Sequence, residues 1–332
     1  MVITIALTLL INSTTITIAS VGDIMMGTTY PDTFLPPAQG QYLFREASPY
    51  FKQADIVFGN LEGTLCNEGI PRKKAKRGKV YLFRTPPSFA KNLKDAGFTV
   101  MSLANNHTLD FGLAGLDSTK EALKSMGIGY VTKYGDVFTT QINGLTVKFL
   151  GFSTGPPPGS ILYPQKPLAQ IEAISKECDI LVVSVHGGGE GRDFLHTKDE
   201  EETFLGEKRG NLVKFARSAI DNGADVVLCH GPHVPRAMEV YKEKLIVYSL
   251  GNFCTYGGMK LTGEAGLAPL VIIEVDGKGV FVKGRVISFI QYPPGGPRLD
   301  RKGKALKLIQ TLSTQDFPES SPVFSGEDFF PH

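Results

Sequence analysis

The chain has 332 residues and a formal net charge of +2, and 20% of its residues are charged. This balance excludes the dense basic surface that a general nucleic-acid-binding protein needs, so we expect no nucleic-acid partner. With 42% hydrophobic residues, the composition is that of a globular protein with one large core or two smaller ones.

The first eleven residues, MVITIALTLLI, are almost entirely apolar. This run is too short for a membrane-spanning helix, which takes about 20 residues, but it has the length of a signal-peptide core. No Lys or Arg precedes it, so two interpretations stay open: the remnant of an export signal over residues 1–13, or an additional N-terminal strand. We favour the signal, which predicts a protein exported to the periplasm or cell surface, with a cytoplasmic location as the alternative.

From residue 14 to residue 229, apolar β-branched runs alternate with segments of helical periodicity, which is typical of an α/β domain. Asn143-Gly144 between two alternating runs predicts a hairpin over 141–153. The pattern predicts strands over 14–22, 55–59, 98–104, 179–185 and 225–229, and helices over 41–54, 87–97, 112–127 and 210–223.

Beyond residue 236, hairpins replace this alternation. We expect them over 236–250 and over 267–291, the second with its turn at Asp276-Gly277, followed by a helix over 302–313. Crossover units followed by hairpins favour a mixed sheet, or two sheets packed face to face with helices outside. With no internal repeat and no linker, we expect one domain over 14–313 and a C-terminal tail over 314–332.

Polar side chains follow five of the predicted strands at the points where they end. Four of the six histidines of the chain are among them. Because strand ends of an open α/β sheet face a common crevice where ligands bind, we expect these side chains to meet. They are Asp23; Asn60 and Glu62; Asn105, Asn106 and His107; His186; and His230 with His233.

Imidazole, carboxylate and carboxamide donors together favour a divalent transition metal, Mn, Fe or Zn, over Ca or Mg. The number of donors favours a dinuclear site with two ions about 4 Å apart. For any one of these residues, a turn, a helix cap or a structural histidine is the simpler explanation. Their coincidence at five strand ends is what favours a metal site.

Five motifs resemble those of a known family and occur in its order. Through them, residues 15–310 resemble the bacterial capsule-synthesis (CapA, or PGA_cap) family, which is linked to poly-γ-glutamate and belongs to the calcineurin-like metallophosphoesterase superfamily. The resemblance implies a four-layer α/β/β/α sandwich of two mixed sheets, with a dinuclear centre in loops at the sheet edge. The motifs are SVGDIMMG, VFGNLEGTL, SLANNHTLDFG, VSVHGGGE and CHGPHVPRAMEVYKEKLIVYSLGNF.

The resemblance also assigns roles to individual residues. His107 corresponds to the histidine that protonates the leaving oxygen or stabilises the transition state. Asn105 is expected to support the turn beside the substrate, and Glu190 is retained from the fourth motif, so both are candidates for substrate contact. The metal ligands that the resemblance implies are Asp23, Asn60, Glu62, Asn106, His186, His230 and His233.

This sequence departs from the superfamily at several positions. Met25 stands where the first motif has a histidine ligand, and Asn60 stands where a bridging aspartate is usual. Both changes leave the centre with less negative charge and fewer strong donors. Gly187 and Gly191 replace two aromatic residues of the fourth motif, which predicts a more open pocket.

The resemblance implies a metal-dependent phosphoesterase-like hydrolase, in which metal-activated water attacks a phosphoester during the biosynthesis of a poly-γ-glutamate capsule or another cell-surface polymer. The expected partners are an anionic substrate, either a phosphoester or polyglutamate, and membrane-bound capsule-synthesis machinery. Met25 and Asn60 keep an alternative open: a non-catalytic metal-binding component of poly-γ-glutamate synthesis or export.

Three further features have functional interpretations. The basic run PRKKAKRGK, residues 71–79, is either a solvated loop or a segment that attracts an anionic substrate. Arg84 is a candidate for direct contact with that substrate, with a surface ion pair as the alternative. Ser153 in GFSTG fits the nucleophile motif of serine hydrolases, but TGPPPG follows it where a helix is required, so this remains a remote alternative.

Overall fold

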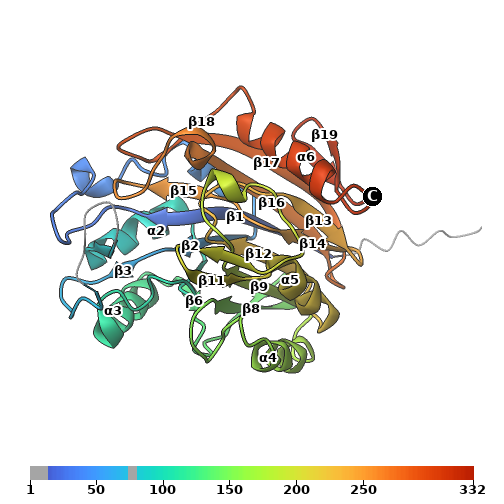
Figure 1. The fold of residues 1–332 in the computed structure, drawn as a ribbon, viewed down its shortest axis with the longest axis horizontal. Helices are drawn as coiled ribbons and strands as arrows, with labels where there is room; N and C mark the ends of the chain where they lie inside the picture. Colours follow the sequence, from blue (N-terminus) through green and yellow to red (C-terminus); the bar gives the residue numbers. More distant parts are fainter. Residues whose placement is uncertain (1–13, 74–80) are drawn as a thin grey trace, which may run out of the picture.

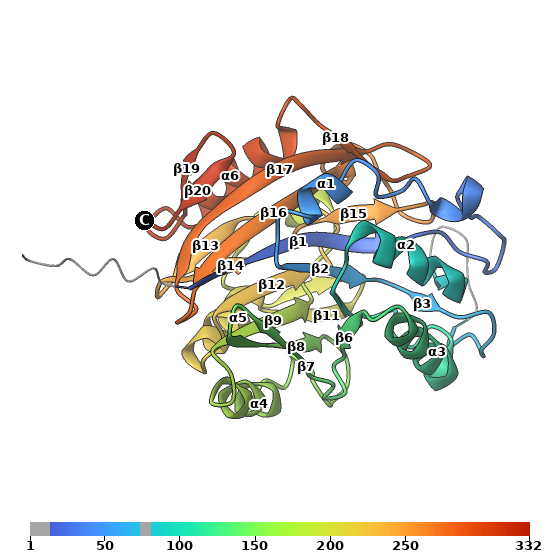
Figure 2. The same ribbon diagram turned by 180° about the vertical axis from the view of Figure 1, so that it is seen from behind.

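The computed structural model describes residues 14–73 and 81–332. Two large β-sheets pack face to face, and helices cover both outer faces (Figures 1 and 2). This four-layer α/β/β/α sandwich of two mixed sheets confirms the predicted fold class. Within the described ranges, no helix combines the length and the apolar content needed to cross a bilayer.

The larger sheet has ten strands in the order β19-β20-β17-β16-β1-β2-β5-β6, with β15 paired to β1 and β18 paired to β17. Strand β1 is parallel to β2 and antiparallel to β16, so the sheet is mixed. Its strands are β1 (Thr15–Met25), β2 (Ile56–Leu61), β5 (Val100–Ser102), β6 (Gly129–Val131), β15 (Asn252–Thr255), β16 (Leu267–Asp276), β17 (Phe281–Gln291), β18 (Pro297–Leu299), β19 (Val323–Ser325) and β20 (Asp328–Phe330).

The smaller sheet has six strands in the order β13-β14-β12-β9-β8-β7, with antiparallel hairpins at both edges and parallel strands between them. These strands are β7 (Phe138–Ile142), β8 (Leu145–Ser153), β9 (Ile180–His186), β12 (Val226–His230), β13 (Met238–Tyr241) and β14 (Lys244–Val247). Two short sheets pair β3 (Thr64–Leu65) with β4 (Arg84–Thr85) and β10 (Glu202–Phe204) with β11 (Glu207–Gly210).

The space between the two large sheets is filled by apolar side chains from both. Ile18 and Phe58 from the larger sheet and Phe149, Val182 and Leu228 from the smaller one are all buried there. The rings of Phe58 and Phe149 stack with centroids 5.8 Å apart. Each such side chain contributes about 1.5–3 kcal/mol when fully buried, so this layer holds the two sheets together.

Helices bury their apolar faces against the outer side of each sheet. The larger sheet is covered by α1 (Ser48–Phe51), α2 (Ala90–Ala96) and α3 (Gly112–Ser125), and the smaller one by α4 (Gln165–Ser175) and α5 (Leu212–Asp221). Helix α6 (Lys304–Asp316) packs against β13, β16 and β17, so it contacts both sheets. Short 3-10 segments occur at Pro37–Gly40, Pro87–Phe89, Arg192–Phe194 and Gly263–Gly266.

Besides several short strands that were not predicted, the structure departs from the predicted elements in three longer segments. The predicted helix over 41–54 is wrong for most of its length, because only α1 is helical and turns precede it. Pro49 lies in the first turn of α1, where its missing N–H is tolerated; farther inside a helix it would break a hydrogen bond. Helix α4 was not predicted. It begins just after the proline-rich turn at 156–159 and has Pro167 in its first turn.

The segment 314–332, expected to be a tail, belongs to the body of the fold. It completes α6 and then forms the hairpin β19-β20, which pairs with β17. Phe329 is fully buried in the layer between the sheets. The predicted export signal over 1–13 and residues 74–79 of the basic run lie outside the described residues.

Candidate metal centre

Parallel strands in register carry polar residues to the same edge of each sheet. In the larger sheet, Asp23 of β1 is in register with Asn60 of β2 on one side and with Asn252 of β15 on the other. In the smaller sheet, His186 at the end of β9 is in register with His230 at the end of β12. Because neighbouring parallel strands end together, each sheet presents a row of donors at one edge.

Glycine at position 22 allows the backbone of Asp23 to approach the segment around Gly251 closely. A Cβ on Gly22 would lie 1.9 Å from the carbonyl oxygen of Gly251, a distance that no side chain tolerates. The backbone N–H of Asp23 donates to that same oxygen at 2.8 Å. Gly22 therefore fixes Asp23 beside the segment that leads into Asn252.

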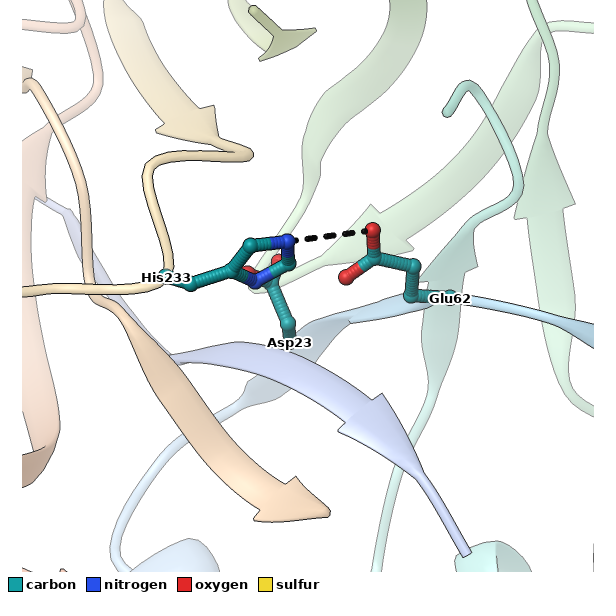
Figure 3. A group of neighbouring side chains, drawn as sticks. All are labelled: Asp23, Glu62 and His233. Atoms are coloured by element: carbon teal, nitrogen blue, oxygen red, sulfur yellow. Dashed lines mark ion pairs between the residues drawn. The ribbon is translucent and has the colours of Figure 1, made fainter. Parts of the chain in front are cut away.

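His233 lies between the carboxylates of Asp23 and Glu62, as Figure 3 shows. Its Nδ1 is 3.0 Å from Asp23 Oδ2, and its Nε2 is 3.6 Å from Glu62 Oε1. One donor atom from each of the three residues lies within 4.8 Å of the others, which is a spacing that a metal ion can bridge. His233 has φ +59°, a left-handed conformation costing roughly 1–2 kcal/mol in a residue with a Cβ.

Glu62 has no solvent exposure and is surrounded by imidazole rings. Its Oε1 is 3.3 Å from His186 Nε2 and 3.9 Å from His107 Nε2, in addition to the His233 contact. Residues from β9, from the loop after β5 and from the loop after β12 therefore converge on one carboxylate that follows β2.

Two asparagines connect Asp23 to the loop after β5. Asn60 donates from Nδ2 to Asp23 Oδ1 at 2.9 Å, and its own Oδ1 accepts from Asn105 Nδ2 at 3.0 Å. Asn105 Nδ2 also donates to the carbonyl oxygen of Leu61 at 2.9 Å. Both ends of the Asn60 carboxamide are therefore engaged, and the chain of contacts orients the Asp23 carboxylate.

The centre leaves buried donor atoms without hydrogen-bond partners. Among the described residues, seven such atoms belong to four site residues, Asp23, Glu62, His186 and His230. Buried polar atoms are normally hydrogen-bonded, because an unpaired one costs about 1–3 kcal/mol. Oxygen and imidazole nitrogen atoms that converge unpaired are suited to a divalent transition metal, so the residues present fit such an ion.

The pKa values of two histidines of the centre shift in opposite directions. Burial is the main reason that the pKa of His230 falls to about 4, with Asp23 opposing the shift. For His233 burial is outweighed by Glu62 and Asp23, which raise its pKa to about 10. Burial would raise the pKa of Glu62, but His233, His186 and His107 hold it well below its ordinary value. Glu62 is therefore kept ionised, as a metal ligand must be.

His107 is held by a second acidic residue from its own loop. Its Nδ1 lies 2.8 Å from Asp110 Oδ2, which also accepts from the Phe83 backbone N–H at 2.7 Å. The Phe83 ring packs on the imidazole with centroids 4.6 Å apart. Burial opposes protonation, but Asp110 and Glu62 outweigh it and raise the pKa of His107. The Nε2 side of the ring faces Glu62.

The two asparagines before His107 differ in burial and in their contacts. Asn105 is buried and reaches Asn60, whereas Asn106, the predicted ligand, is exposed. The Asn105 side-chain oxygen also accepts from the His107 backbone N–H at 3.0 Å. Adjacent residues of this turn point in different directions, so only one asparagine can face the centre, and the structure turns Asn105 toward it.

The two other predicted substrate contacts are placed differently from each other. Arg84 donates to Thr29, and its guanidinium lies over the rings of Tyr30 and Phe111, at 5.5 and 5.1 Å from their centroids. These protein groups surround its guanidinium, and Arg84 is not among the residues that line the two clefts beside the centre. Glu190 does line a cleft of about 550 Å³, together with His107 and His233, and pairs with Arg209.

Sequence reasoning missed two residues of the centre. Asn252 is buried, its Oδ1 lies 3.1 Å from His233 Nδ1, and its Nδ2 donates to the His233 carbonyl at 3.2 Å. The sequence signal for Asn252 is another polar residue at the end of an apolar run, in YSLGNF. The second missed residue is Asp110, a carboxylate three residues after His107. Met25 is buried, and its sulfur accepts from Gly27 N–H at 3.2 Å.

The remote serine-hydrolase interpretation finds no support in these contacts. Ser153 is fully buried, and its hydroxyl donates to the carbonyl oxygen of Thr154 at 3.2 Å. A turn rather than a helix follows it. Among the described residues, no histidine is hydrogen-bonded to the Ser153 hydroxyl.

Comparison with solved structures gives the class of fold. A crystal structure described as a novel phosphatase from Mycoplasma pneumoniae superposes with a TM-score of 0.52 at 15% sequence identity, over 90% of this chain and 100% of that one. At this identity the likeness concerns the fold alone, which is that of the calcineurin-like metallophosphoesterases.

Comparison with families is more specific. The model described as "Bacterial capsule synthesis protein PGA_cap" matches residues 17–256, and the chain belongs to this family. The capsule biosynthesis protein CapA of Bacillus anthracis is 32% identical over 76% of this chain and 62% of its own length. The PGA biosynthesis protein CapA of Bacillus subtilis is 30% identical over 74% of this chain and 65% of its own length. The chain thus spans less than two thirds of either relative.

Proposed function

We propose that the chain is a metal-dependent phosphoesterase that acts in the synthesis of a capsule or another cell-surface polymer. The observation that carries this proposal is the convergence of seven unpaired buried donor atoms beside His107, which is held by the carboxylate of Asp110. Protein groups alone do not satisfy these atoms, and a metal ion would. The capsule-synthesis names of the relatives support the biological setting.

The residues that would hold the metal come from both sheets. We infer one or two ions of Mn, Fe or Zn. A bound ion of this kind would lower the pKa of coordinated water and neutralise charge on a phosphoryl group. Asn60 and Asn105 would orient the Asp23 carboxylate through their hydrogen bonds. The side chains that would hold the metal are Asp23, Glu62, His186, His230 and His233.

His107 would supply a proton to the leaving oxygen. Asp110 holds its Nδ1 side, so the Nε2 side is directed toward the centre. The raised pKa favours the protonated imidazole, which is the form that a general acid needs. The Phe83 ring excludes water from one face of the imidazole and limits its rotation.

Replacing His107 tests this role. His107→Ala should lower kcat on p-nitrophenyl phosphate and bis(p-nitrophenyl) phosphate, with added Mn²⁺, by about 10²–10⁴-fold, while metal content by mass spectrometry stays near normal. His196→Ala is the matched control, because His196 also pairs with an aspartate, Asp316 at 2.7 Å, but is largely exposed and lies outside the centre. Full activity of the His107 variant would contradict the role.

A non-catalytic function is the second candidate. Met25 offers no donor to the centre, and both ends of the Asn60 carboxamide are occupied by Asp23 and Asn105. A metal held by fewer strong donors suits a structural or polymer-binding component of poly-γ-glutamate synthesis or export. Binding of polyglutamate without turnover of either phosphoester, at full metal loading, would favour this candidate.

We further propose that the chain works outside the cytoplasm with membrane-bound synthesis machinery. The capsule and PGA biosynthesis names of the relatives support this setting, since a capsule is assembled at the cell surface. Fractionation of cells that produce the full-length protein tests it. Recovery in the cytosol alone would contradict it.

A further inference from the structure

A second cleft adjoins the one that Glu190 lines, and the two share His107. Its volume is about 400 Å³, within the range of small-molecule sites. Tyr81 and His107 line both clefts, so the two meet at the proposed general acid. The residues that line only the second cleft come from the segment between β3 and β4, from the loops after β5, β6 and β8, and from the β10–β11 hairpin.

This cleft is strongly basic. Five cationic side chains line it, against two carboxylates, Asp110 and Glu207. Asp110 is engaged with His107 and with the Phe83 N–H, and Glu207 is largely exposed and lies near Arg209. Neither carboxylate neutralises the other cations. The cationic residues are Arg72, Lys73, Lys133, Lys208 and Arg209.

Lys133 is the cationic residue of this cleft whose surroundings most clearly indicate an anionic ligand. It is only 9% exposed, its ammonium donates to one carbonyl oxygen, that of Pro156, at 3.3 Å, and it lies 5.6 Å from the centroid of the Tyr134 ring. Among the described residues it forms no ion pair, and the segments 1–13 and 74–80 contain no Asp or Glu. A lysine buried to this degree is ordinarily paired. Burial and then the nearby Arg72 lower its pKa, as expected for a cation that lacks a carboxylate.

Arg72 is fixed beside the same loop. Its backbone N–H donates to the carbonyl oxygen of Asp110 at 2.8 Å, which ties the start of the basic run to the His107 loop. Arg209 is buried and pairs with Glu190 at the other cleft. Among the described residues, the cations of the second cleft that form no ion pair are Arg72, Lys73, Lys133 and Lys208, and of these only Lys133 is buried.

We propose that this cleft is a subsite for a second anionic group of the substrate, with Lys133 as its principal contact. This inference rests on the proposed function for the position of the reacting phosphorus. The substrate class it names is a phosphoester that carries a further phosphate or carboxylate on the side of Lys133. A simple monoester would leave Lys133 and Arg72 without a partner.

Binding of small oligoanions to the metal-free protein tests the subsite without requiring turnover. Tripolyphosphate is the phosphate probe and tri-γ-glutamate is the carboxylate probe, each titrated calorimetrically into the full chain after chelation of metal. Lys133→Met, which keeps the apolar stem, should weaken binding of the preferred probe about tenfold, and Lys133→Arg should restore it.

Lys148→Met is the matched control. Lys148 is similarly buried, at 13% side-chain exposure, but it pairs with Glu177 and lies in β8, upstream of the turn that reaches the cleft. The variant loses the same charge and should bind the probe like the wild type. Equal weakening by both variants would show a general charge effect and overturn the proposal, as would unchanged binding by Lys133→Met.

The two probes separate the sources of the anion. Binding of only one probe assigns the subsite to phosphate or to carboxylate, and binding of neither overturns it. Because these titrations use metal-free protein, they can support the subsite even if the chain has no phosphoesterase activity. An active phosphoesterase in which Lys133→Met changes nothing would retain the proposed function and lose the subsite.

Discussion

Two glutamates of this protein, Glu62 and Glu239, have no solvent exposure, but their surroundings differ. Glu239 accepts hydrogen bonds from Arg217 at 2.6 Å, Tyr248 at 2.7 Å and Ser320 at 2.9 Å, so both of its oxygens are satisfied. Both Glu62 oxygens lack a hydrogen-bond partner, although imidazole rings surround them. Both carboxylates are buried, but protein donors satisfy Glu239, whereas both Glu62 oxygens remain available for the metal ion proposed above.

The same contrast separates other polar groups. Arg84 satisfies its guanidinium with Thr29 and two aromatic rings, whereas Lys133 has one carbonyl oxygen and the Tyr134 ring for three N–H donors. In each pair, the residue whose polar atoms are satisfied by protein groups contributes to stability, and the residue whose polar atoms are not satisfied indicates a ligand site.

The largest expected effect is on metal binding at Glu62. Glu62→Gln removes an ionised ligand, so metal affinity should fall by more than the roughly 10–100-fold that follows the loss of an outer partner. Glu239→Gln should leave metal content unchanged and lower the free energy of unfolding by about 2 kcal/mol. This cost is below the roughly 3–5 kcal/mol of a fully buried pair, because Arg217 is about one-third exposed.

Metal analysis and denaturant unfolding of the two variants, side by side, check this prediction. If Glu239→Gln also depletes the metal, or if Glu62→Gln retains it, the distinction between the two buried carboxylates is wrong.

A smaller effect should distinguish Asn105 from Asn106. Asn105→Ala removes the contacts to Asn60 and to the His107 backbone, so we expect metal affinity to drop by about 10–100-fold. Asn106→Ala should change it less than twofold, because Asn106 is exposed. Competition titrations with a chromogenic chelator measure both affinities. The reverse ranking would restore Asn106 as the ligand.

The smallest effect is expected at Arg84. Arg84→Met removes two cation–π contacts and the hydrogen bond to Thr29, which together contribute about 1 kcal/mol to stability. KM for p-nitrophenyl phosphate should be unchanged. Thermal unfolding and steady-state kinetics check these outcomes, and a raised KM with unchanged stability would return Arg84 to the substrate site.

The amino-acid sequence by itself determined the alternation of strands and helices and the polar residues at strand ends. Continuous apolar runs such as DILVVSVH and DVVLCH can be recognised locally, because a strand buried on both faces needs apolar side chains along its length. The sequence therefore predicted Asp23, Glu62, His186, His230 and His233 as one group, and the structure brings them together.

Only the tertiary structure decided which way individual side chains point and which partners they find. The choice between Asn105 and Asn106 depends on the direction of one turn, and the role of Arg84 depends on rings at positions 30 and 111. Neither is encoded in local spacing. The same holds for the roles of Asn252, Asp110 and Lys133, which depend on their contacts in the folded protein. Whether a buried polar group is hydrogen-bonded depends on neighbours that only folding brings within reach.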